Sequence, residues 1–145
     1  MPINFDITSA NSKVELVNVL FPAGLSFEGY SVDSASTMDL IQQIEARMGV
    51  DGKIAFGYTP SPKPISFIFQ PNSPTVDRLD YLVQTQDTLK QPIVCQMTIL
   101  LKSLGKRVVL ENGACTNNKL IPNMGRVLEP MQYDFVFQTV NIIPL

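Results

Sequence analysis

The sequence contains no histidine and no tryptophan, and only two of its 145 residues are cysteine. Without histidine the chain cannot form a Ser-His-Asp or Cys-His catalytic system or a histidine-ligated metal site. Two cysteines cannot supply a four-cysteine zinc site either. These absences exclude many hydrolases and zinc proteins, and they leave carboxylate, lysine, tyrosine or Ser-Lys chemistry and metals bound by oxygen ligands.

Charge is also scarce in this chain. Charged residues make up 17% of it, whereas about 25% is typical of a soluble domain. Few charged residues imply a surface of low charge, which suits a protein covered by copies of itself or by partners. A monomer with an uncharged polar surface would have the same composition. The net charge is −2 and the basic residues are scattered, so we expect no basic patch for nucleic acid.

Long hydrophobic runs and nucleotide-binding motifs are missing as well. The longest apolar stretch, 93–101, is short and interrupted by Gln96 and Thr98, so it cannot span a bilayer and we expect no membrane partner. Neither glycine-rich phosphate-binding motif occurs. Asp77 and Asp80 could share a cation, but surface charges that complement a helix dipole explain them better. We therefore expect no enzyme, with no catalytic, cofactor-binding or metal-binding residues and no cofactor.

The apolar residues that are present alternate in the manner of β-strands. Ser73 and Pro74 are typical of a helix start and predict one helix at about 74–87. Asn112-Gly113 is typical of a hairpin turn between two strands. The strands predicted by alternation and β-branched residues cover 3–7, 13–21, 25–32, 65–69, 93–102, 107–111, 114–120 and 132–143. We therefore expect a single domain over residues 1–145, mainly β, a barrel or sandwich of about eight strands with one flanking α-helix.

Residues 37–48 fit two structures. Leu40, Ile41, Ile44 and Met48 fall on one face of a helix, and the local pattern slightly favours that reading. The segment runs, however, into Gly-Val-Asp-Gly at 49–52, a hairpin signal, and residues 53–58 alternate again. The second reading is a long β-ribbon. Three prolines within 59–64 predict a rigid connector after it.

Four aromatic residues also have two readings. Phe56, Tyr58, Phe67 and Phe69 could form a base-stacking platform for single-stranded nucleic acid. The basic residues that would accompany such a platform are missing, so packing in the core is the better prediction. Cys95 and Cys115 are expected to be small, buried and reduced.

The order of the motifs resembles that of the tail tube proteins of contractile-tailed bacteriophages. The resemblance rests on the hairpin 48–58, the strand 65–69, the Ser-Pro helix start in 70–79, and the later stretches 109–116 and 133–137. It covers about residues 35–140. It implies a β-barrel or sandwich with one helix, a fold shared with the type VI secretion tube protein, and it favours strand over helix for 37–58.

The resemblance also implies a function. In that family six copies form a ring, the rings stack into a hollow tube inside a contractile sheath, and DNA passes through the lumen during ejection. The implied partners are the protein itself and the sheath, baseplate and tail-terminator proteins, with the tape-measure protein and DNA transiently in the lumen. The implied location is the virion tail, assembled in the bacterial host cytoplasm. The alternatives are a ligand- or single-stranded nucleic-acid-binding β-barrel module, a baseplate tube initiator or a type VI secretion tube subunit.

The resemblance suggests which residues meet a neighbour and which face the lumen. The candidate inter-subunit ribbon comprises Met48, Gly49, Asp51, Gly52 and Lys53, because pairing between copies needs free strand edges. The candidate lumen-facing residues are Asp39, Gln43 and Glu45, because a lumen that DNA must pass should carry acidic and neutral groups. Arg47 lies on the same face and departs from an all-acidic wall.

Overall fold

The computed structural model describes residues 12–30 and 36–144, and the strand predicted at 3–7 lies outside them. Among the described residues there are nine strands and one helix. One sheet contains β1 (Lys13–Val17), β2 (Leu25–Ser26), β3 (Ser36–Thr37), β6 (Lys63–Phe69), β7 (Cys95–Leu101), β8 (Lys106–Asn117) and β9 (Met131–Pro144). The other contains β4 (Ile44–Met48) and β5 (Ile54–Tyr58), and the helix is α1 (Pro74–Leu89). The prediction of a mainly β fold with one flanking helix is confirmed.

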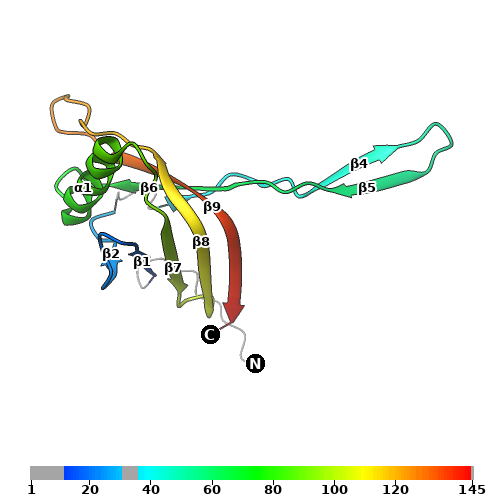
Figure 1. The fold of residues 1–145 in the computed structure, drawn as a ribbon, viewed down its shortest axis with the longest axis horizontal. Helices are drawn as coiled ribbons and strands as arrows, with labels where there is room; N and C mark the ends of the chain where they lie inside the picture. Colours follow the sequence, from blue (N-terminus) through cyan, green and yellow to red (C-terminus); the bar gives the residue numbers. More distant parts are fainter. Residues whose placement is uncertain (1–11, 31–35, 145) are drawn as a thin grey trace.

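The larger sheet is antiparallel and curls into an open half-barrel (Figure 1). Its strand order is β2-β1-β7-β8-β9-β6-β3. β8 and β9 are its longest strands and pair along most of their length, from Lys106 opposite Pro144 to Asn117 opposite Asp134. Of the predicted strand 25–32, whose last two residues lie outside the described ones, residues 25–26 form β2 and Tyr30 forms a single bridge with Phe69.

The core lies on one face of this sheet, and it forms because alternate residues of the strands point to the same side. In β6 every second residue from Ile65 is buried, and in β9 the same alternation runs from Met131 to Phe137. The ring of Phe27 packs edge-on against the rings of Phe67 and Phe69. The core aromatic cluster predicted for Phe67 and Phe69 is therefore confirmed.

α1 buries one face in the same core. Val76, Leu79, Leu82 and Val83 recur at helical spacing and are all buried. The Oγ of Ser73 accepts a hydrogen bond from the backbone N–H of Thr75 at 3.2 Å, and Pro74 occupies the first turn, as expected for a capped helix start. The helix runs two residues beyond the predicted end.

The hairpin predicted at Asn112-Gly113 is wrong, because both residues lie inside the continuous strand β8. Asn112 takes a left-handed φ of 55°, and the pairing with β7 shifts register here, opposite Cys95 and Met97. The irregularity is thus a bulge and not a turn. A side chain at position 113 would place its Cβ 2.2 Å from a ring carbon of Phe137, so glycine is needed for the close approach of that ring.

Strands β4 and β5 form a ribbon that projects far from the half-barrel (Figure 1). The helical reading of 37–48 is wrong, since residues 44–48 are a strand and residues 38–43 are neither helix nor strand. The strand reading taken from the resemblance is confirmed for β4. Among the described residues, the ribbon pairs with no strand of the larger sheet.

Candidate assembly interface on the projecting ribbon

One face of the ribbon is formed by apolar and aromatic side chains, and all of them are exposed. The strand pairs place Ile44 opposite Tyr58, Ala46 opposite Phe56 and Met48 opposite Ile54. Because side chains alternate across a strand, these six residues share one side. We call them the apolar ribbon face: Ile44, Ala46, Met48, Ile54, Phe56 and Tyr58. All six are exposed, and Phe56 shows 68% of its surface to solvent.

The apolar ribbon face has the character of a binding surface. Contiguous exposed apolar patches mark surfaces that bind another molecule, and a two-stranded hairpin alone in water is at best marginally stable. Both outer edges of the ribbon also carry free backbone groups, since neither strand has a second neighbour in the described residues. The core packing predicted for Phe56 and Tyr58 is therefore wrong. The alternation of 44–48 and 54–58 was the signal that could have found this face.

The opposite face of the ribbon is polar. Glu45 pairs with Gly57 and Arg47 with Ala55, and the Arg47 guanidinium lies 3.4 Å from the Glu45 carboxylate. The ladder continues to Gln43, whose carbonyl oxygen accepts a hydrogen bond from the N–H of Thr59 at 2.8 Å. The structure thus brings Gln43, Glu45 and Arg47 onto one arm. Asp39 is exposed but lies before the paired segment.

The tip of the ribbon is a tight turn over residues 49–53. The N–H of Gly49 donates to the carbonyl oxygen of Lys53 at 2.7 Å, and Gly52 takes a φ of +82° that favours glycine. Asp51 Oδ1 accepts a hydrogen bond from the N–H of Lys53 at 3.1 Å. The predicted inter-subunit residues therefore sit together at the outermost end of the molecule, with the fully exposed Val50 among them.

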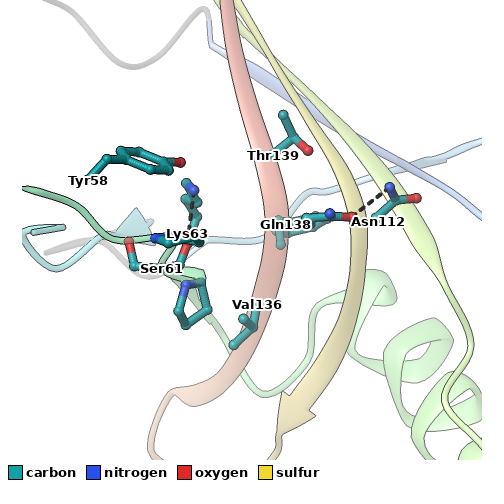
Figure 2. Close-up of a pocket in the computed structure, with 10 residues that line it drawn as sticks. Tyr58, Ser61, Lys63, Asn112, Val136, Gln138 and Thr139 are labelled. Carbon is teal, nitrogen blue, oxygen red and sulfur yellow. Dashed lines mark hydrogen bonds between the residues drawn. The ribbon is translucent and has the colours of Figure 1, made fainter. Parts of the chain in front are cut away.

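A cleft of about 640 Å³ lies at the root of the ribbon. Figure 2 shows its walls, one from the end of β5 and the connector to β6, the other from β8 and β9. The Lys63 ammonium donates to the carbonyl oxygen of Ser61 at 2.9 Å, and the Asn112 amide donates to Gln138 Oε1 at 3.0 Å. The hydroxyl of Ser61 is buried and has no hydrogen-bond partner among the described residues. The lining residues are Tyr58, Pro60, Ser61, Pro62, Lys63, Asn112, Val136, Phe137, Gln138 and Thr139.

Asp77 and Asp80, the two acidic residues considered as a cation site, lie in different environments. Asp77 is exposed in the first turn of α1, as predicted for a charge that complements the helix dipole. Asp80 is half-buried, and its Oδ1 accepts a hydrogen bond from the Tyr133 hydroxyl at 2.5 Å, so the surface reading is wrong for Asp80. Burial raises the pKa of Asp80, and burial also raises the pKa of Tyr133. This pair joins the helix to the sheet.

The two cysteines are free and buried, as predicted. Burial raises the pKa of the Cys95 thiol, and burial, with the nearby Cys95 and Asp134, raises that of Cys115 to about 12. Both thiols therefore stay protonated at neutral pH, which is the unreactive form. Within residues 12–30 and 36–144, no three His, Cys, Asp or Glu side chains are grouped to hold a metal ion. No helix in the described parts of the chain is long and apolar enough to cross a membrane.

Three solved structures share this fold at low sequence identity. The sheath/tube terminator of an extracellular contractile injection system (PVC) in its extended state matches with a TM-score of 0.66 and 10% identity over 98% of this chain and 99% of the other. The tube-terminating cap of the anti-feeding prophage gives 0.60 and 11% over 100% and 95%. A chain of the 6-fold symmetrised anti-feeding prophage baseplate gives 0.58 and 10% over 98% of each.

The family of the chain follows from its sequence. No curated protein matches the chain. The family model described as tail fiber protein gp32 matches residues 5–141, which is nearly the whole chain. The tail tube-like fold inferred from the resemblance is confirmed by the three structures. The chain therefore belongs to the tail fiber protein gp32 family, and it is a structural tail component with the fold of contractile injection system tube-end proteins.

Proposed function

We propose that this protein is a self-assembling subunit of the tube of a contractile tail, and that residues 1–145 act as one tube domain. Copies join into hexameric rings, the rings stack, and DNA passes through the lumen during ejection. The observation that carries the proposal is the apolar ribbon face, which is exposed in the single chain. Its burial against a second copy removes apolar surface from water, and the family and fold support a place in a tail.

The two faces of the ribbon take different roles in this proposal. The apolar ribbon face and the tip residues Met48–Lys53 contact the neighbouring copy. The polar face, with Gln43 and Glu45, and the preceding Asp39, turns toward the lumen. The ion pair between Glu45 and Arg47 neutralises the one cation on that arm, which weakens its attraction for passing phosphate. Sheath, baseplate and tail-terminator proteins contact the outside and the ends of the tube, and the tape-measure protein occupies the lumen before DNA. The role is structural and non-enzymatic.

The likeness to terminating caps favours a second candidate of the same kind. Two of the similar structures are tube-end proteins. A tube-end protein forms one ring and stops, whereas a tube subunit adds ring upon ring. The two functions therefore differ in whether the assembly grows with concentration. A type VI secretion tube subunit or a baseplate initiator would act in a different machine with the same fold.

The experiment is to follow assembly of the purified protein over a wide concentration range by light scattering and negative-stain microscopy. We expect rings at intermediate concentration and tubes of uniform width at high concentration. Single rings that never stack would favour the tube-end function. A monomer at every concentration and salt would overturn both.

A pair of variants tests the ribbon itself. Phe56→Ser places a hydroxyl on the apolar ribbon face and is expected to abolish rings. Ala55→Ser makes a similar polar change on the opposite face of the same strand and is expected to leave them intact. Equal loss in both variants would contradict a contact through the apolar ribbon face.

A further inference from the structure

The tip of the ribbon presents an apolar side chain beside a carboxylate. Val50 is fully exposed, although it stands in a turn where polar residues are usual. Asp51 uses one carboxylate oxygen to accept the N–H of Lys53, and the described residues provide no partner for the other. The flanking Gly49 and Gly52 carry no side chains, so the tip is narrow. It is a convex group that offers one apolar contact and one negative charge.

The cleft at the root of the ribbon offers the complementary groups. Pro60, Pro62 and Val136 supply apolar walls, and Lys63 is its one cationic side chain among lining residues that include no carboxylate. The Lys63 ammonium has three N–H groups, and in the described residues its one hydrogen bond goes to a neutral carbonyl. Figure 2 shows this side chain beside the ring of Tyr58, across the cleft from Thr139. No carboxylate among the lining residues therefore balances the charge of the Lys63 ammonium.

A tip cannot reach the cleft of its own chain. Residues 52–58 separate Asp51 from the connector, and the strand β5 within them spans about 17 Å at 3.3 Å per residue. Figure 1 shows the tip at the far end of the projecting ribbon. A contact between tip and cleft must therefore join two copies. Because the two surfaces differ, the contact is head-to-tail, and repeated contacts of this kind close into a ring or continue as a filament.

We propose that the ribbon tip of one copy binds in the root cleft of the next, with Asp51 paired to Lys63 and Val50 packed against the cleft prolines. The inference rests on the proposed self-assembly, and it names the two surfaces that meet. It assigns the Met48–Lys53 segment a specific binding site, the root cleft, on the neighbouring copy. It also makes the ring heterologous at this contact, so that every copy both gives a tip and receives one.

Mixed crosslinking tests which surfaces meet. Val50→Cys and Gln138→Cys variants are prepared separately and assembled with a short bismaleimide crosslinker. The native thiols are buried, and the wild-type protein with crosslinker is the control. We expect crosslinked dimers in the mixture and none in either variant alone. Crosslinking of Val50→Cys with itself would indicate a symmetric contact between tips and would overturn the proposal.

A charge exchange tests the ion pair. Asp51→Lys and Lys63→Asp each place like charges together, so each should raise the concentration needed for assembly by about tenfold or more. The double variant restores the pair with reversed sign and should assemble nearly as the wild type does. Lys106→Asp makes the same charge change at the start of β8 and should not rescue Asp51→Lys.

The outcomes separate this proposal from the one on which it rests. If the wild type never assembles, self-assembly fails. If the wild type and the charge variants assemble equally well, self-assembly stands and the contact between tip and cleft is overturned. Loss in both single variants without rescue in the double variant also overturns the ion pair, because independent damage at two sites would not be relieved by combining them.

Discussion

The strand pair β6–β9 and the ribbon pair β4–β5 have the same sequence pattern and opposite environments. Both carry apolar or aromatic residues at every second position over much of each strand. In β6 the ring of Phe67 is 0% exposed, whereas in β5 the ring of Phe56 is 68% exposed. The difference in exposure comes from what covers each strand pair. The core faces of β6 and β9 are covered by α1 and Phe27, while every residue of β4 and β5 is exposed.

This contrast shows what an alternating pattern encodes. It specifies that one face of a strand pair will leave water, but not whether the covering surface belongs to the same chain. In the half-barrel the cover is intramolecular and contributes to folding. On the ribbon the cover has to come from elsewhere, so its apolar area contributes to association. The variants below compare matched positions in the two regions.

The largest expected difference is between Phe67→Ala and Phe56→Ala. Phe67 is completely buried, so its truncation leaves a cavity and should lower the free energy of unfolding by about 3–5 kcal/mol. Phe56 is 68% exposed and loses little intramolecular burial, so the change there should stay within about 0.5 kcal/mol. Urea denaturation of dilute, monomeric protein measures both. A similar loss in the two variants would mean that the ribbon is covered within the monomer.

The next comparison uses two glycines. Gly113→Ala places a methyl group 2.2 Å from the Phe137 ring, and such overpacking should cost about 1–3 kcal/mol. At Gly57, in the ribbon, an added Cβ meets nothing within 4 Å, so Gly57→Ala should leave stability nearly unchanged. Thermal unfolding followed by circular dichroism distinguishes them. Normal stability of Gly113→Ala would show that β8 can relax away from β9 at the bulge.

A smaller effect is expected for side chains that cap local turns. Ser73 is buried, caps α1 and also donates a hydrogen bond to the carbonyl oxygen of Glu28. Ser73→Ala should cost about 1 kcal/mol. Asp51 accepts a hydrogen bond within the ribbon tip but is exposed, so Asp51→Ala should change monomer stability by less than about 0.5 kcal/mol. Equal losses in urea denaturation would show that the ribbon turn is coupled to the folding of the half-barrel.

The smallest effect concerns pH and the surface of the half-barrel. Burial alone would raise the pKa of Asp134, but hydrogen bonds from Gln132, Ser66 and Asn117 outweigh it and lower that pKa. The folded pKa is below the unfolded one, so this group stabilises the protein above the unfolded pKa of about 3.9. Its contribution is lost as the pH falls through the folded pKa.

Asp134→Asn should therefore weaken the decline of the melting temperature between neutral and strongly acidic pH. Melting curves of both proteins at a series of pH values measure this. An unchanged pH profile in Asp134→Asn would contradict the assigned sign.

Local signals predicted the parts of the fold that depend on local chemistry. Ser73 and Pro74 predicted the start of α1 because capping needs only neighbouring residues. Gly49 and Gly52 predicted the ribbon turn for the same reason. At residues 37–48 the local pattern favoured a helix. The resemblance to a tube family favoured strand, which is correct for residues 44–48, where pairing with β5 outweighs helix propensity, but not for residues 38–43, which are neither helix nor strand.

The sequence predictions were wrong where the structure depends on partners distant in sequence. Asn112-Gly113 has the composition of a turn, yet the pairing of β8 with β9 holds the strand together, and the glycine serves the approach of Phe137. Phe56 and Tyr58 were expected in the core because a single sequence does not reveal that residues 44–58 leave the half-barrel. Lys63 and Gln138 both line the cleft at the ribbon root although they lie far apart in the sequence. No local pattern could predict that they come together.

The connector between β5 and β6 has a consequence for geometry. It contains Pro60 and Pro62, and the fixed φ angles of proline limit how the ribbon can swing. In the proposed head-to-tail assembly, each ribbon docks on the next copy. The direction in which a ribbon leaves its half-barrel therefore sets the angle by which each copy is rotated relative to the one before it. The number of copies that complete a circle would then depend in part on these two proline torsions, and a more flexible connector would permit rings of mixed size.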